Sequence, residues 1–150
     1  MSRACFSMSR VIPASPGQVF HLLDDYEHGH WRVLPPAFSE YRVLEGGFGA
    51  GTRIAFSLTT GGRRMLTEGV VTVPEPGRVI VETYPRERMV TTFTVDADDD
   101  GARLTIATSI PAHSPLTHLE ERVLQRLLEP IYTEEFDLIA KWAPHWYSAT

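Results

Sequence analysis

Glu135 is the residue whose type and position most directly suggest chemistry. From residue 114 to residue 146 the sequence has the pattern of one long amphipathic helix, because apolar residues recur on one broad stripe at about 100° per residue. In projection Glu135 falls inside that stripe, between Ile131 and Leu138. Burial there would raise the pKa of the carboxyl group and make Glu135 a proton donor or a hydrogen-bond anchor for a ligand. Alternatively, the helix rolls slightly and Glu135 reaches solvent.

A second candidate is the segment that holds His28, His30 and Trp31. Two histidines one residue apart chelate a metal only with help from a third ligand, and the sequence marks none. The six histidines also lack an HExxH spacing, so we expect loop packing and no metal.

Other catalytic signatures are missing from the sequence. No GxSxG motif surrounds any serine, which removes the basis for a Ser-His-Asp triad. Cys5 stands alone in a predicted strand with no marked base beside it. The glycine-rich residues 46–51 precede a strand rather than a helix, so they predict a hairpin loop and not a phosphate site. We therefore expect no cofactor.

Composition sets the broad class. With 150 residues, 43% hydrophobic and 22% charged, the chain matches one globular domain, residues 1–150. A net charge of −5 argues against nucleic acid as a partner. No apolar run approaches the roughly 20 residues of a membrane span, and the start lacks a signal-peptide pattern. We expect a cytoplasmic protein without integral membrane association.

The elements that must position these residues follow from periodicity and turn signals. Ser15, Pro16 and Gln18 predict a capped helix over residues 16–25. Residues 28–38 predict an irregular connection. Glycine and proline turns separate the predicted strands, and such short connections favour an antiparallel meander. The strands are expected at residues 4–12, 40–45, 52–60, 64–73, 78–84, 88–95 and 103–110.

The last helix contains Pro130, which lacks an amide hydrogen and clashes with the preceding turn. We expect it to kink the helix near residues 126–128, although a break into two helices is the alternative.

Alternation along the strands indicates which side chains face the interior. The larger apolar set of residues 52–60 is expected to point inward, as are alternate residues of the last two strands. The register of residues 78–84 stays ambiguous, because Val79, Val81 and Thr83 compete with Ile80, Glu82 and Tyr84. The candidate ligand-binding residues are Trp31, Ile54, Phe56, Leu58, Tyr84, Phe93, Leu104, Ile106, Leu128, Ile131, Tyr132, Glu135 and Leu138.

Four local sequences add a family resemblance to this order of elements. They are Val11 to Phe20, Gly49 to Thr52, Val73 to Ile80 and Gly101 to Thr105. Together with the element order they resemble the START-like, Bet v 1-like (SRPBCC) superfamily, also described as the polyketide cyclase/dehydrase and lipid transport group. The resemblance implies an α+β helix-grip fold, a curved seven-stranded antiparallel sheet around a long C-terminal helix. It also implies a cavity for apolar molecules between them, over whose entrance Trp31, Pro35, Pro36 and Phe38 are candidates for a lid.

Three functions remain open at this point. The leading prediction is binding of a small hydrophobic or lipid-like molecule in an internal cavity, with transport or sensing as an extension. The alternative is a cyclase, aromatase or dehydratase in which Glu135 is the candidate acid. The third is a protein-interaction module that uses Trp142, Trp146 and Tyr147 as an exposed aromatic patch. Edge strands and this patch also allow a homodimer.

Overall fold

The computed structural model describes residues 2–113 and 115–146. Its strands are β1 (Arg3–Ile12), β2 (Phe38–Glu45), β3 (Arg53–Thr60), β4 (Arg63–Glu75), β5 (Val79–Tyr84), β6 (Met89–Asp98) and β7 (Gly101–Pro111). Its helices are α1 (Pro16–Asp24), α2 (Thr117–Trp142) and two short 3-10 helices, η1 (His30–Val33) and η2 (Ala143–His145). All seven predicted strands are present, with ends shifted by a few residues.

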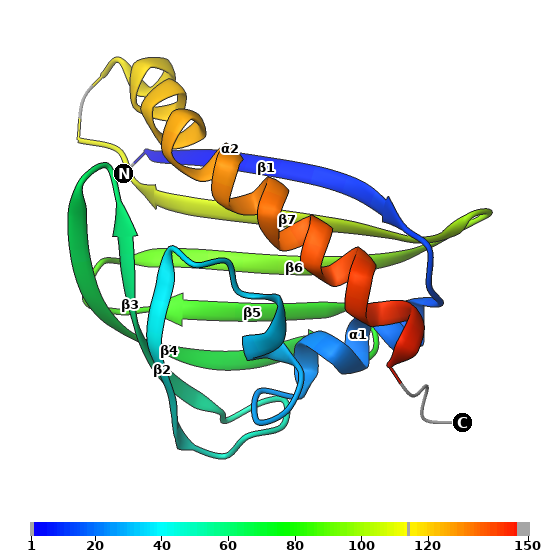
Figure 1. Cartoon of the computed structure of the whole chain (residues 1–150). Coiled ribbons are helices and arrows are strands. Elements are labelled where there is room, and N and C mark those ends of the chain that lie inside the picture. The colour runs from blue at the N-terminus through cyan, green and yellow to red at the C-terminus, as the bar shows by residue number, and fades with distance from the viewer. Residues whose placement is uncertain (1, 114, 147–150) are drawn as a thin grey trace.

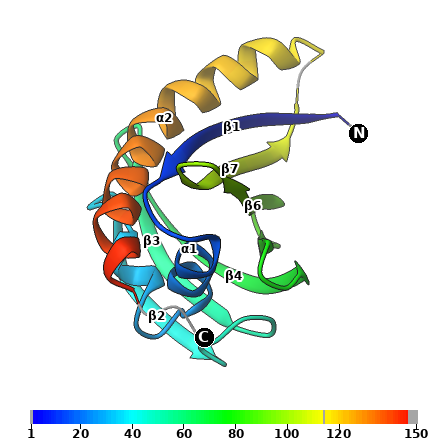
Figure 2. The same ribbon diagram turned by 90° about the vertical axis from the view of Figure 1, so that its right-hand side faces the viewer.

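The strands form one antiparallel sheet in the order β1-β7-β6-β5-β4-β3-β2. From β2 to β7 each strand pairs with the next along the chain, as the short connections predicted. β1 instead pairs with β7, from Arg3 opposite Pro111 to Ile12 opposite Ala102. The sheet curves, and α2 runs over its concave side (Figures 1 and 2). The predicted helix-grip fold is confirmed.

Helix α1 begins as the sequence predicted. The Ser15 hydroxyl accepts a hydrogen bond from the Gln18 amide at 3.1 Å, and the Gln18 side chain accepts one from the Ser15 amide at 2.9 Å. This reciprocal capping box satisfies two amides that a helix start otherwise leaves without partners. The helix then buries Val19, Leu22 and Leu23 against the rest of the core.

Helix α2 is continuous through Pro130. Figure 2 shows it bending around the sheet, so the predicted kink describes it better than a break into two helices. It begins at Thr117, three residues later than expected, and Ser114 lies outside the described residues.

The apolar stripe of α2 is buried over only part of its length. Ile131, Phe136 and Ile139 are buried in the main core. Leu119 and Val123, in the first turns, are exposed by 46% and 60%. Those turns run along β1 at the margin of the sheet (Figure 1). Leu124 and Leu128, in the same half of the helix, are buried, so only the part of the stripe that carries Leu119 and Val123 is left uncovered by the described residues.

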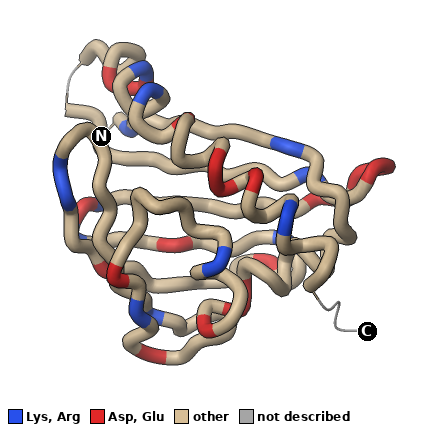
Figure 3. The backbone as a smooth tube through the Cα atoms, viewed as in Figure 1, with Lys and Arg blue, Asp and Glu red and all other residues tan. Residues whose placement is uncertain are grey.

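Charged residues are spread over many elements (Figure 3). Acidic side chains gather at the turn between β6 and β7, where Asp98, Asp99 and Asp100 follow one another. Lys and Arg are dispersed rather than gathered on one element. Within the described part of the chain, no helix has both the length and the apolar character needed to cross a membrane.

Candidate functional site

A cavity of about 50 Å³ lies between the concave face of the sheet and α2. Its apolar wall consists of Leu34, Phe38, Ile54, Phe56, Leu58, Met89, Phe93, Leu128 and Ile131. Its polar wall consists of His30, Glu82, Tyr84, Thr91, Thr108, Tyr132 and Glu135. Since a water molecule needs roughly 10–15 Å³ of such space, the cavity has room for a few water-sized groups.

Strand register places the wall residues. On β3, Ile54, Phe56 and Leu58 point into the cavity, as the alternation predicted. On β5 the structure resolves the ambiguity in favour of Ile80, Glu82 and Tyr84, which are all buried, whereas Val79, Val81 and Thr83 are only half-buried. This register places the acidic residue Glu82 on the face of the sheet that lines the cavity.

The Glu82 carboxyl group accepts hydrogen bonds from two tyrosine hydroxyl groups. The Tyr26 hydroxyl donates to Oε2 and the Tyr84 hydroxyl donates to Oε1, each at 2.6 Å. Glu82 is only 4% exposed, so these hydrogen bonds replace the water that a surface carboxylate would have. Burial, followed by the nearby Glu82 charge, raises the pKa of both tyrosines well above their ordinary value. Both hydroxyls therefore remain donors.

His30 supplies the third contact to Glu82. Its Nδ1 lies 2.9 Å from the carbonyl oxygen of Leu23, and its Nε2 lies 3.3 Å from Oε2 of Glu82. A carbonyl oxygen only accepts, so Nδ1 carries a proton. The Nε2 atom is at ion-pair distance from Oε2 of Glu82, and the pair is ionic when the imidazole is protonated.

Gly69 on β4 allows Tyr84 to take its position. A Cβ atom at Gly69 would lie 2.6 Å from Cε1 of the Tyr84 ring, well inside van der Waals contact. The ring therefore lies directly on the β4 backbone, and its hydroxyl reaches Glu82. A glycine in a strand interior commonly marks such a close approach.

Glu135 projects from α2 toward the same cavity. It is 3% exposed, and its Oε2 has no hydrogen-bond partner among the described residues. Burial, with a smaller contribution from the nearby Glu82 charge, raises the pKa of Glu135 to about 8. The side chain is therefore mainly a neutral carboxylic acid at neutral pH, and its Oε2 is left without a partner among the described residues.

A short chain of hydroxyl groups completes the polar wall. Tyr132 is hydrogen-bonded to Thr108, and Thr108 is hydrogen-bonded to Thr91 at 2.8 Å. Burial is the main reason that the pKa of Tyr132 is raised. The hydroxyl groups of this chain are thus already occupied by one another, in contrast to Oε2 of Glu135.

A second and larger hollow lies outside the cavity, between the α1–η1 segment and β2. We call it the outer groove; its volume is about 690 Å³, and its walls include Tyr26, Trp31, Leu34, Phe38 and Tyr41. The remaining lining residues are Glu27, His28, Ser39, Glu40, Arg42 and Val43. Leu34 and Phe38 line both the outer groove and the cavity.

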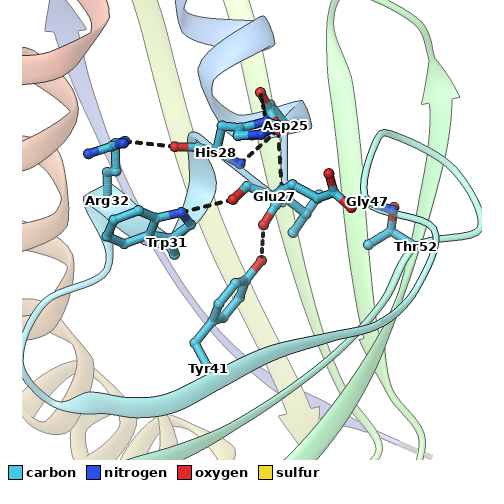
Figure 4. A network of polar contacts seen from close by, with 9 residues as sticks. Asp25, Glu27, His28, Trp31, Arg32, Tyr41, Gly47 and Thr52 are labelled. Atoms are coloured by element: carbon cyan, nitrogen blue, oxygen red, sulfur yellow. Dashed lines mark hydrogen bonds and ion pairs between the residues drawn. The ribbon is translucent and has the colours of Figure 1, made fainter.

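Hydrogen bonds fix the aromatic walls of the outer groove. Trp31 Nε1 donates to the Glu27 carbonyl at 2.9 Å, and the Tyr41 hydroxyl donates to the Tyr26 carbonyl at 2.7 Å. Figure 4 shows Trp31 and Tyr41 reaching toward this same stretch of backbone. Asp25 supports the stretch by accepting the His28 amide at 2.9 Å.

The sequence matches the family model described as "Polyketide cyclase / dehydrase and lipid transport" over residues 3–143. The chain belongs to this family. The match confirms the resemblance to the START-like, Bet v 1-like superfamily. The curated protein sequences gave no match.

Several solved structures share the fold of this member of the polyketide cyclase/dehydrase and lipid transport family. The KanY protein (ms6282) has a TM-score of 0.82 at 24% identity, covering 95% of this chain and 99% of that chain. An aromatase/cyclase, Zhui, from Streptomyces sp. R1128 has a TM-score of 0.72 at 14% identity, covering 95% and 94%. Major latex-like protein 151 from Panax ginseng has a TM-score of 0.65 at 14% identity, covering 93% and 96%. At these identities the likeness establishes the fold.

Most of the residues expected to bind a ligand lie together at the cavity of this family member. Those that line it are Ile54, Phe56, Leu58, Tyr84, Phe93, Leu128, Ile131, Tyr132 and Glu135. Leu104 and Ile106 are fully buried in the core but are not among the lining residues, and Leu138 is half-buried outside the lining. Trp31 is 44% exposed and lines the outer groove instead.

Four polar wall residues were not among the predicted ligand-binding residues, namely His30, Glu82, Thr91 and Thr108. His30 was expected to pack in a loop, but it is 2% exposed and faces Glu82. No orientation was predicted for Glu82, because the register of its strand was ambiguous. The pattern did contain one signal, the acid within an otherwise apolar and β-branched strand, but its partners come from residues far away in the sequence.

The C-terminal aromatic residues pack inward in this family member. Trp142 and Trp146 are half-buried against the core, so they do not form the expected exposed patch, and Tyr147 lies outside the described residues. Within residues 2–113 and 115–146, no three His, Cys, Asp or Glu side chains gather in a way that could hold a metal ion. The polar side chains that line the cavity carry carboxyl, imidazole, phenol and hydroxyl groups.

Proposed function

We propose that the protein binds a small, uncharged, mostly apolar molecule whose carbonyl group accepts a hydrogen bond from Glu135. The observation that carries this proposal is the buried Oε2 of Glu135, which has no partner among the described residues. A neutral carboxylic acid has one donor, and a buried donor without an acceptor costs free energy. A ligand carbonyl would remove that cost.

The walls of the cavity support the apolar part of this ligand. Phe56, Phe93 and Ile131 are buried side chains that line it, and burial of apolar surface contributes roughly 25 cal/mol per Å². The family name, which includes both cyclases and lipid transport, agrees with an apolar ligand. Binding requires some widening of the cavity, since its volume is about 50 Å³.

An acid-catalysed dehydration is the second candidate, favoured by the pKa of about 8 at Glu135. Glu135 would donate its proton to a departing hydroxyl group, which leaves as water. The resulting carboxylate would then take a proton from the neighbouring carbon as the double bond forms, and this restores the acid. The likeness in fold to an aromatase/cyclase supports this reading. Formation of a dehydrated product from a β-hydroxyketone, measured by mass spectrometry, distinguishes catalysis from binding alone.

The binding proposal is tested with acetophenone and α-methylstyrene, which have nearly the same shape but differ in the carbonyl oxygen. We expect acetophenone to bind roughly 3- to 10-fold more tightly, which corresponds to one net hydrogen bond of about 0.5–1.5 kcal/mol. Glu135→Leu should abolish the preference, whereas Glu135→Gln should keep it because an amide also donates. Calorimetric titration at pH 7 measures these affinities.

Glu134→Gln is the matched control, because Glu134 is the exposed neighbour on the same helix. Its preference should equal that of the unmodified protein. Failure of both compounds to bind, or an unchanged preference in Glu135→Leu, would overturn the proposal.

A further inference from the structure

The cavity and the outer groove are separated by a thin partition. Leu34 and Phe38 line both hollows, so each side chain has one surface in the cavity and another in the outer groove. Tyr26 also lines the outer groove, while its hydroxyl bonds Glu82 in the cavity wall. The partition is therefore one side chain thick at these positions.

The two hollows differ in size and in chemistry. The cavity has a volume of about 50 Å³, and one of its lining residues is Glu135, whose Oε2 has no partner among the described residues. The outer groove has a volume of about 690 Å³. A carbonyl group with a few attached atoms suits the first, whereas the second has room for the body of a much larger molecule.

The walls of the outer groove suit a flat apolar body. Trp31 keeps 44% of its surface exposed, and Tyr41 and Phe38 add two further rings. Trp31 and Tyr41 are each held by a hydrogen bond to backbone, so little conformational entropy remains to be lost when a ligand packs on them. Arg32 adds a further restraint, because its guanidinium carbon lies 4.5 Å from the centre of the Trp31 ring.

We infer that the ligand is an elongated aryl ketone or a similar flat carbonyl compound that occupies both hollows. Its carbonyl end passes between Leu34 and Phe38 to Glu135, and its aromatic body lies against Trp31 and Tyr41 in the outer groove. Arg42 and Glu40 are exposed lining residues of the groove, so the far end of the molecule stays in contact with water. This inference rests on the proposed function and extends it to the length and shape of the ligand.

The test compares a long ketone with a short one. Prodan, 6-propionyl-2-(dimethylamino)naphthalene, has a carbonyl end and a fluorescent naphthalene body, whereas acetophenone is short enough to stay near the cavity. We expect Trp31→Ala to weaken prodan binding about 5- to 20-fold, as loss of one aromatic stacking contact does, and to leave acetophenone within 2-fold. Trp31→Phe should restore most of the prodan affinity, because it keeps a flat ring.

Leu66→Ala is the control, since Leu66 is an exposed apolar residue, 54% exposed, that lines neither hollow. It should leave both affinities unchanged. Leu34→Trp enlarges the partition and should slow prodan association in a stopped-flow measurement. Folding of every variant is checked by circular dichroism.

The outcomes separate this inference from the proposed function. If acetophenone binds with the expected dependence on Glu135 but prodan does not bind, or binds equally well to Trp31→Ala, the ligand does not extend into the outer groove. An equal loss of both ketones in Trp31→Ala also overturns the inference, because Trp31 would then act on the fold rather than on the ligand body. Absence of carbonyl-dependent binding by either ketone overturns the proposed function.

Discussion

His30 Nε2 lies 3.3 Å from Oε2 of Glu82, and the two side chains are 2% and 5% exposed. The other nitrogen of His30 donates to the Leu23 carbonyl, so the imidazole joins the end of α1 to the middle of the sheet. Removing one member of a buried pair leaves the other without compensation, which costs more than the pair contributes as a whole.

The contact between His30 and Glu82 predicts that the effect of Glu82→Gln on the free energy of unfolding changes when His30 is also replaced. His30→Phe should lower the free energy of unfolding by about 3 kcal/mol, because Glu82 and the Leu23 carbonyl both lose a partner. Glu82→Gln should be destabilising in the unmodified protein but neutral or stabilising in the His30→Phe background, since it removes a buried carboxyl group. Urea unfolding measures the four proteins.

His28→Phe serves as the control for His30→Phe. The His28 side chain is 63% exposed, so we expect a loss below about 1 kcal/mol. An equal cost of Glu82→Gln in both backgrounds would show that His30 and Glu82 are not coupled.

Glu135 predicts a specific dependence of stability on pH. Its pKa is raised from the ordinary value of 4.5 to about 8 in the folded protein. Below pH 4.5 the carboxyl group is neutral in both states and carries no penalty. As pH rises from 4.5 to 8, the unfolded chain releases the proton while the folded chain keeps it, so stability falls and then levels off above pH 8.

Replacement of Glu135 by Gln should remove this contribution. Relative to the unmodified protein, the variant should gain a few kcal/mol between pH 4.5 and pH 8, with no further gain at higher pH. Chemical denaturation across this range, with Glu134→Gln as the reference, gives the difference directly. A constant difference at every pH would contradict the raised pKa.

Gly69 predicts a packing effect that reaches the polar cluster. Gly69→Ala places a methyl group 2.6 Å from the Tyr84 ring, so the ring must move away from β4 and stretch its bond to Glu82. Overpacking of this kind costs typically 1–3 kcal/mol, measurable by thermal unfolding. Gly17→Ala in α1 is the comparison, because the nearest atom lies 3.9 Å away, and it should be neutral or stabilising. Equal stability of the two alanine variants would disprove the close approach.

Arg32 predicts a link between η1 and the end of α2. Its guanidinium carbon lies 4.5 Å from the Trp31 ring centre and 5.0 Å from the Trp142 ring centre. Arg32→Ala should destabilise the protein by about 1–2 kcal/mol, the sum of two cation–π contacts. Arg42→Ala, on the neighbouring groove rim, should have a smaller effect in the same thermal unfolding assay. If both variants melt at the same temperature, Arg32 does not join the two rings.

The architecture and half of the site could be predicted because the signals for them lie in short stretches of sequence. In β3 the large apolar residues Ile54, Phe56 and Leu58 share one face, so alternation alone determines which side faces the cavity. In α1 the cap is encoded within four residues. These signals are local, and each can be recognised without knowing the rest of the chain.

The polar cluster could not be predicted in the same way. Its inward register on β5 favours Glu82 over Val81, against simple hydrophobicity, and the compensation comes from Tyr26, 56 residues away. His30 is buried because η1 folds back onto α1, which no periodic pattern encodes. Non-local hydrogen bonds therefore decided what side-chain alternation left open.

Pro130 divides α2 into two halves that differ in how deeply their side chains are buried. The later half carries Glu135 and is anchored by Phe136 and Ile139, which are completely buried. The earlier half carries the exposed residues Leu119 and Val123. Because Pro130 has no amide hydrogen, one backbone hydrogen bond between the two halves of the helix is absent. We therefore expect the first turns of the helix to open more readily than the later half, which carries Glu135. Faster amide exchange over residues 119–127 than over residues 133–140 would register that motion, and uniform protection would refute it.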